Sequence, residues 1–147
     1  MGNLKDKYCI VGVGETEYSR NSGRTQRAMA VQAVKAAMDD AGLGQDGVDG
    51  MLSYHGNDST TSMLVAHDLG LQLNFFMDCS GGGSSTEALI GIAIGVIEAG
   101  MCHSVAIYRS MNGYTFRRIG GTPGGGVAPM AVVTGEALMS ATYGRTS

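Results

Sequence analysis

The chain has 147 residues, of which 44 % are hydrophobic and only 16 % are charged, so it has enough apolar residues for one domain with a core and is not a disordered tail. Its net charge of -3 provides no basic surface that would attract nucleic acid. The longest apolar stretch, residues 88–99, is shorter than the roughly 20 residues of a transmembrane helix, so we expect no membrane segment.

The first apolar run, residues 8–14, is rich in β-branched residues and ends in glycine. This pattern predicts a buried strand, which we expect at the centre of a sheet. Residues 25–41 then place apolar side chains at helical spacing. Thr25 is the expected N-cap of this helix, and Gly42 is its expected terminator.

The same alternation of strands and helices continues through the next part of the chain. Strands are expected at residues 48–54, 73–77 and 104–108, and helices at residues 60–69 and 84–99. Strands that alternate with helices in this way favour an α/β fold, in which a mostly parallel sheet is flanked by helices on both faces.

The composition changes after the last of these strands. Residues 120–126 are mostly glycine and cannot continue a regular element, so we expect a surface loop there. Pro129 opens a predicted helix that ends near Tyr143. These features divide the chain into an α/β domain over residues 1–110 and a loop region with a terminal helix over residues 111–147.

The three cysteines, Cys9, Cys79 and Cys102, are odd in number and widely separated. This arrangement favours free thiols in a reducing compartment over a disulfide framework or a zinc site. The first residues also lack the apolar stretch of a signal peptide. We therefore expect a cytoplasmic protein with no bound metal.

Gly12 and Gly14 follow the first predicted strand, as in a dinucleotide-binding fingerprint. The fingerprint is incomplete, because Glu17 occupies the place of its third glycine and the carboxylates of this turn would repel a phosphate. We do not expect a nucleotide site here. The glycines more simply permit turns or a close approach between backbone segments.

A second glycine-rich turn, residues 81–84, joins a predicted strand to the N-terminus of the long helix. Free backbone N–H groups and the helix dipole at such a position stabilise a thiolate, an oxyanion or an enolate. The alternative is a tight turn that needs glycine only for its backbone angles. Three consecutive glycines exceed that need, so we predict a substrate pocket formed by Gly81, Gly82, Gly83 and Ser84.

Several segments, taken in order, resemble the thiolase superfamily, and most closely its sterol-carrier and lipid-transfer-protein branch. They are the stretch Tyr8 to Tyr18, the helix end Asp39 to Leu43, the Val48-Asp49-Gly50 strand start, and Ile97 to Gly100. The resemblance covers the whole chain and implies a layered thiolase-like half, with residues 1–110 as an incomplete N-terminal thiolase-like domain.

Thiolases have a nucleophilic cysteine at the start of the long helix, and the resemblance implies that this chain would have one there too. Cys79 is the candidate for this role in the chain. Aligning Ile97 and Gly100 with the corresponding helix end of the family, without a gap, instead places Gly83 at the nucleophile position. We therefore favour an enzyme that lacks the nucleophile, with Cys79 as the alternative.

Without a cysteine at this position, the chain resembles the steroid side-chain-cleaving aldolases of this superfamily. These aldolases also have a Tyr-Arg-x-x-Asn stretch, which in this chain runs from Tyr108 to Asn112. This likeness implies retro-aldol cleavage of a β-hydroxyacyl-CoA, with catalytic tyrosines from a second half of the fold. Tyr108, Asn112 and His55 are expected at the substrate pocket. The other two histidines, His67 and His103, are expected on the surface or at helix ends.

We expect coenzyme A only as part of the substrate, with no tightly bound cofactor; Arg117 and Arg118 are weak candidates for binding its phosphates. The resemblance implies a homodimer that pairs through residues 104–108. It also implies an acyl-CoA-binding partner protein with a zinc ribbon and an OB fold. A genuine acyl-CoA thiolase and a non-catalytic acyl-CoA- or lipid-binding protein remain alternatives.

Overall fold

The computed structural model describes residues 3–54, 59–80 and 85–112. These ranges contain three α-helices, one short 3₁₀ helix and three strands. In chain order they are α1 (Gln26–Ala41), η1 (Gln45–Gly47), β1 (Gly50–Tyr54), α2 (Ser62–Leu69), β2 (Phe75–Cys79), α3 (Ser85–Glu98) and β3 (Val105–Tyr108).

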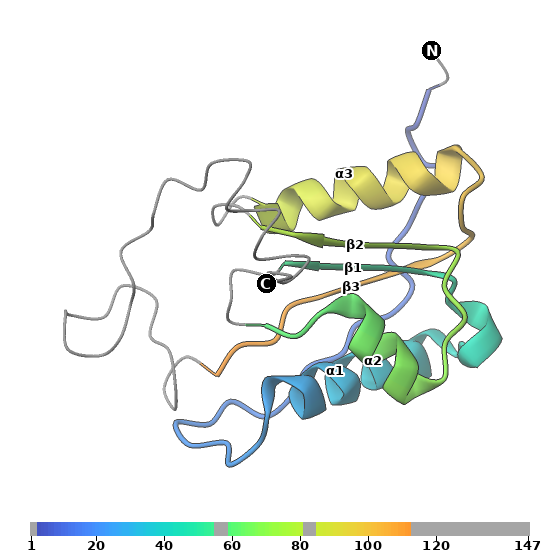
Figure 1. Cartoon of the computed structure of the whole chain (residues 1–147). Coiled ribbons are helices and arrows are strands. Elements are labelled where there is room, and N and C mark those ends of the chain that lie inside the picture. Colours follow the sequence, from blue (N-terminus) through green and yellow to red (C-terminus); the bar gives the residue numbers. More distant parts are fainter. Residues whose placement is uncertain (1–2, 55–58, 81–84, 113–147) are drawn as a thin grey trace, which may run out of the picture.

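The three strands form one parallel sheet in the order β2-β1-β3. Helix α3 covers one face of this sheet, and α1 and α2 cover the other face (Figure 1). The described part of the chain is therefore a three-layer α/β structure. This confirms the predicted parallel sheet with helices on both faces.

Strand β1 lies at the centre of the sheet, and all five of its residues are buried. Successive side chains of a strand point to opposite faces, so its neighbours Met51 and Leu52 enter different clusters. Met51 packs with residues of α1 and α2, such as Val34 and Val65. Leu52 packs with Leu89 of α3. The two faces of one short strand thus join both helical layers.

The predicted central strand at residues 8–14 is wrong. No strand is assigned to this segment, and Ile10 and Val13 are 76 % and 71 % exposed. The segment lies across a groove of about 800 Å³ from β3, and residues of α1 and α3 also line this groove. The segment makes no ladder with β3, and the central position in the described sheet belongs to β1.

The glycines of this segment instead permit close contact with α1. A Cβ atom on Gly12 would lie 2.3 Å from the Ala37 carbonyl oxygen, and one on Gly14 would lie 2.3 Å from the Ala33 carbonyl oxygen. The Val13 amide also donates a hydrogen bond of 2.9 Å to Asp40. The interpretation as close backbone approach is confirmed, and the contacts of this turn are with a helix.

The predicted helix ends agree with the structure. The Thr25 side chain accepts a hydrogen bond from the Ala28 amide, and Gly42 and Gly70 both terminate their helices in the left-handed conformation, with φ of 68°. Strand β2 begins two residues later than predicted and extends to Cys79. The predicted loop region and terminal helix at residues 113–147 lie outside the described residues.

Candidate functional site

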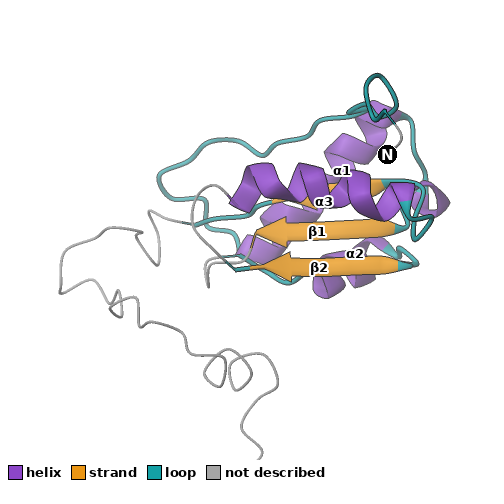
Figure 2. Cartoon of the chain, turned by 90° about the horizontal axis from the view of Figure 1, so that it is seen from above, coloured by secondary structure: helices purple, strands orange, loops and turns teal. Residues whose placement is uncertain are grey.

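The carboxyl ends of the three parallel strands meet at one edge of the sheet (Figure 2). Ligands of open α/β sheets bind at this edge, because the loops that follow the strands gather there. In the strand register, Ser53 lies between Asp78 and Tyr108, and Tyr54 pairs with Cys79. These strand ends carry the described part of the candidate site.

Cys79 is the last residue of β2 and is partly buried. Its side chain packs with the cluster formed by Leu52, Tyr54 and Leu89, on the α3 face of the sheet. Helix α3 itself begins at Ser85. Cys79 therefore belongs to the strand. All three cysteines are free thiols, as predicted.

Most of the predicted site residues lie outside the described residues, so their placement stays a prediction. With Ser84 included they number seven: His55, Gly81, Gly82, Gly83, Ser84, Arg117 and Arg118.

Tyr108 and Asn112 are described, and both are buried in internal contacts. The Tyr108 hydroxyl donates a hydrogen bond of 2.7 Å to the Thr60 carbonyl oxygen. Asn112 donates to the Arg24 carbonyl oxygen at 2.9 Å and accepts from the Ser22 hydroxyl. Tyr108 faces the α1 and α2 side of the sheet, whereas Cys79 faces α3. The structure does not bring these predicted site residues together.

The Tyr108 phenol is held in its neutral form. Burial raises its pKa, and the nearby Asp78 charge raises it further. The phenol is therefore protonated at neutral pH, and its contact with Thr60 shows it acting as a donor.

Sequence analysis missed a carboxylate that links the strand ends. Asp78 accepts hydrogen bonds from the Ser53 hydroxyl and, at 2.9 Å, from the Ser62 amide. Ser53 and Ser62 are fully buried. The predicted strands end at residues 54 and 77, which indicates that Ser53 and Asp78 lie near the same edge. The contact between their side chains, however, depends on the strand register.

Arg109 and Tyr54 form a second contact at this edge. The Arg109 guanidinium carbon lies 4.3 Å from the centroid of the Tyr54 ring, which is a cation–π geometry. Tyr54 is buried, whereas Arg109 is exposed. A cation is thus held against the end of β1, beside the strand end that carries Cys79.

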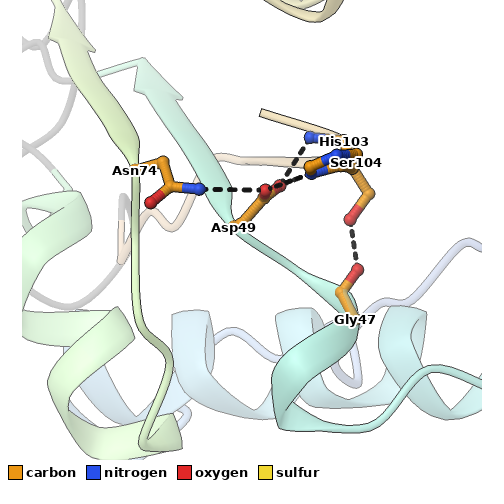
Figure 3. A network of polar contacts seen from close by, with 5 residues as sticks. All are labelled: Gly47, Asp49, Asn74, His103 and Ser104. Atoms are coloured by element: carbon orange, nitrogen blue, oxygen red, sulfur yellow. Dashed lines mark hydrogen bonds and ion pairs between the residues drawn. The ribbon is translucent and has the colours of Figure 1, made fainter. Parts of the chain in front are cut away.

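The opposite, amino edge of the sheet contains a polar network around Asp49 (Figure 3). The Asp49 carboxylate accepts hydrogen bonds from the amides of His103 and Ser104, from the His103 ring and from the Asn74 side chain, at 2.8 to 3.2 Å. These partners precede β2 and β3. Because ligands are expected at the other edge, we assign this network to the fold.

The described residues contain no group of three or more histidine, cysteine or acidic side chains that would hold a metal ion. Within the same residues, no helix combines the length and the apolar character needed to cross a membrane. His67 and His103 have side chains that are 83 % and 93 % exposed, as predicted.

No family model matches the chain. A 17-hydroxy-3-oxo-4-pregnene-20-carboxyl-CoA lyase from Mycobacterium tuberculosis is 35 % identical over 118 residues, which cover 80 % of this chain and 30 % of the lyase. A steroid side-chain-cleaving aldolase from Thermomonospora curvata is 34 % identical over 113 residues, which cover 76 % of this chain and 29 % of the aldolase. The chain is a relative of the steroid side-chain-cleaving aldolases. It spans about 30 % of the length of these curated relatives.

Solved structures place this aldolase relative within the thiolase-like fold. An Ltp2-ChsH2(DUF35) aldolase superimposes with a TM-score of 0.68 and 30 % identity, covering 90 % of this chain and 31 % of that chain. A monomeric SCP2-thiolase-like protein from Mycobacterium smegmatis gives a TM-score of 0.56 and 26 % identity, covering 67 % of this chain and 22 % of that chain. The family and fold inferred from the sequence are confirmed.

Proposed function

We propose that this aldolase relative takes part in retro-aldol cleavage of a steroid whose side chain is a β-hydroxyacyl-CoA. The observation that carries the proposal is the identity of 35 % over 80 % of the chain to a lyase named for a 17-hydroxy steroid carboxyl-CoA. The position of Cys79 within β2, six residues before the start of α3, supports a reaction without a cysteine nucleophile. Coenzyme A enters only as part of the substrate.

The proposed reaction needs no covalent intermediate. A base removes the proton of the β-hydroxyl group. An electron pair of the hydroxyl oxygen then forms a carbonyl at Cβ as the bond between Cα and Cβ breaks. The electron pair of that bond remains on the thioester as an enolate, which is then protonated at Cα. The products are a ketone steroid and a shortened acyl-CoA, and backbone N–H donors of a glycine-rich turn suit the enolate oxygen.

The test is an assay of the protein expressed from its complete reading frame with a 17-hydroxy steroid carboxyl-CoA. Mass spectrometry should detect the ketone steroid and the shortened acyl-CoA in equal amounts, without consumption of free coenzyme A. A matched substrate that lacks the 17-hydroxyl group should not be cleaved. Cleavage that requires free coenzyme A would instead identify a thiolase.

The thiolase alternative assigns a nucleophilic role to Cys79. Under our proposal, Cys79→Ala retains the cleavage rate, because Cys79 packs in an apolar cluster with Leu52 and Leu89. Under the alternative, the same substitution abolishes turnover, and iodoacetamide labels Cys79 much faster than the exposed Cys9. Peptide mass analysis of the labelled protein separates the two outcomes.

A non-catalytic acyl-CoA- or lipid-binding protein is the second alternative. It predicts binding of the steroid CoA ester without product, even when the partner protein is present. We propose that this partner is a separate acyl-CoA-binding protein with a zinc ribbon and an OB fold. The Ltp2-ChsH2(DUF35) composition of the aldolase that superimposes on this chain supports such an assembly. Co-purification with that partner tests the proposal.

We also propose a cytoplasmic homodimer. The three free thiols support a reducing compartment. We place the dimer contact at residues 104–108, as the resemblance implies, and Ile107 in this segment is 36 % exposed. Light scattering should show a dimer that Ile107→Lys converts to a monomer.

A further inference from the structure

The carboxylate of Asp78 connects the end of β2 to two other elements. Its Oδ1 atom accepts hydrogen bonds from the Ser53 hydroxyl in β1 and from the Ser62 amide at the start of α2. Both donors belong to residues with 0 % exposure, so water does not provide them with an alternative acceptor. Hydrogen bonds to a charged acceptor in such surroundings are stronger than those between neutral groups.

Helix α2 begins without a cap from its own N-cap residue. Thr61 has the extended backbone of an N-cap, but its side chain makes no capping hydrogen bond. Helix α1 differs, because the Thr25 side chain accepts a hydrogen bond from the Ala28 amide. Asp78 supplies an acceptor to α2 from the neighbouring strand, and its negative charge is favourable at a helix N-terminus. The start of α2 is thus fixed by β2.

The same carboxylate lies directly before the point where the chain leaves the sheet. Asp78 is followed by Cys79, which ends β2, and by the exposed Ser80. In the strand register Asp78 is opposite Ser53, which is in turn opposite Tyr108. The hydrogen bond between Asp78 and Ser53 therefore joins the carboxyl ends of β2 and β1. Phe76, two residues earlier on the same face of β2, has an exposed apolar side chain that cannot form such a hydrogen bond.

We propose that Asp78 is a positioning residue of the lyase site. Through Ser53 and the Ser62 amide it fixes the end of β2 relative to β1 and α2, and so it sets the position of this strand end at the carboxyl edge. The inference rests on the proposed function and adds to it a residue that acts through hydrogen-bond geometry.

The chemistry of the two bonds makes this role testable. Both bonds end on Oδ1 of Asp78, and an asparagine carries an acceptor oxygen at the equivalent place. Asp78→Asn therefore retains the geometry without the charge, whereas Asp78→Ala removes both bonds. Ser53→Ala removes one of the bonds and leaves Asp78 in place.

The experiment combines hydrogen exchange with kinetics on the protein expressed from its complete reading frame. We expect Asp78→Ala to accelerate amide exchange in the first turn of α2 and at the end of β2. We also expect kcat for cleavage of the steroid CoA ester to fall by roughly tenfold to a hundredfold, with a smaller change in KM. Asp78→Asn should restore most of both losses, and Ser53→Ala should give an intermediate effect.

The matched control is Asp49→Ala, which removes a hydrogen-bonded carboxylate from the opposite edge of the sheet. It should leave exchange at the start of α2 and kcat per folded molecule unchanged. The proposal is overturned if Asp78→Ala matches the wild type in both measurements, or if Asp78→Asn is as impaired as Asp78→Ala, which would assign the effect to the charge. If the wild type cleaves no CoA ester, the proposed function fails, while the exchange data still decide the role of Asp78.

Discussion

Asp49 shows how one residue holds three strands together. Its carboxylate binds the residues that precede β3, and its backbone carbonyl accepts hydrogen bonds from Asn74 and Phe75 at the start of β2. Burial by itself raises the Asp49 pKa, but the hydrogen bonds from the His103 ring and from the amides of Ser104 and His103 outweigh burial and lower the pKa to about 2. The ionised form therefore stabilises the folded chain.

The lowered pKa predicts a pH dependence of stability. The contribution of Asp49 is complete above the unfolded pKa of 3.8 and is lost as the pH falls from there towards about 2. The difference in unfolding free energy between the wild type and Asp49→Asn should therefore be largest above pH 3.8 and should shrink below it. Urea denaturation at several pH values measures this difference, which we expect to be about 1–3 kcal/mol at neutral pH.

The control for this series is Asp46→Asn, which makes the same change on the exposed surface of η1. It should change the unfolding free energy by no more than about 0.5 kcal/mol at any of these pH values. Equal effects of the two substitutions would contradict the role assigned to Asp49.

At the scale of elements, helices α1 and α2 begin in different ways although both follow a threonine. Thr25 caps α1 with its own side chain, whereas Thr61 makes no such bond and α2 depends on Asp78. Both threonines have an extended backbone, so local sequence alone does not separate the two cases. The difference lies in the strand that passes the start of α2.

This difference predicts unequal effects of the same substitution. Thr25→Ala should reduce the unfolding free energy by about 1 kcal/mol, because the Ala28 amide loses its acceptor. Thr61→Ala should cost much less, because no capping bond is lost. Chemical denaturation of both variants measures the difference, and an equal loss would show that Thr61 also acts as a cap in solution.

The contact between residues 8–14 and α1 is decided by glycine. Gly14→Ala would place a Cβ atom 2.3 Å from the Ala33 carbonyl oxygen, which forces the segment away from the helix. We expect a loss of about 1–3 kcal/mol in the unfolding free energy. Gly44→Ala is the control, because its Cβ position is open and its φ is -81°. A neutral Gly14→Ala would show that this contact contributes little.

At the scale of the whole molecule, β1 is the element on which both layers depend. Met51 is fully buried in the cluster between the sheet and helices α1 and α2, and Leu52 is fully buried below α3. The helical layers on both faces of the sheet thus pack against the same five-residue strand. A defect in β1 affects both clusters.

Met51→Ala should therefore be among the more destabilising substitutions, with a loss of about 2–5 kcal/mol. Met63 on α2 is 58 % exposed, so Met63→Ala should change the unfolding free energy by no more than about 0.5 kcal/mol. Thermal or urea denaturation of the two variants compares the same chemical change at a buried and an exposed site. A mild effect of Met51→Ala would contradict the placement of β1 at the centre.

The sequence by itself determined the local structure of this protein and its family. Periodicity, Thr25 and the terminal glycines predicted the three helices and the strands that became β1, β2 and β3, because these signals act between residues close in the chain. The ordered set of motifs predicted the thiolase-like fold. The sequence placed the wrong apolar run at the centre of the sheet, because residues 8–14 and residues 50–54 both have the apolar pattern of a buried strand.

Only the tertiary structure decided how distant residues meet. The neighbours of Gly12 and Gly14 are residues of α1, and the donors to Asp78 come from β1 and α2, so neither role can be read from local spacing. The same holds for Cys79, which the strand register assigns to the end of β2 and the α3 face. Strand order and register depend on packing between elements far apart in sequence, and a strand's own residues fix only the two faces that it presents.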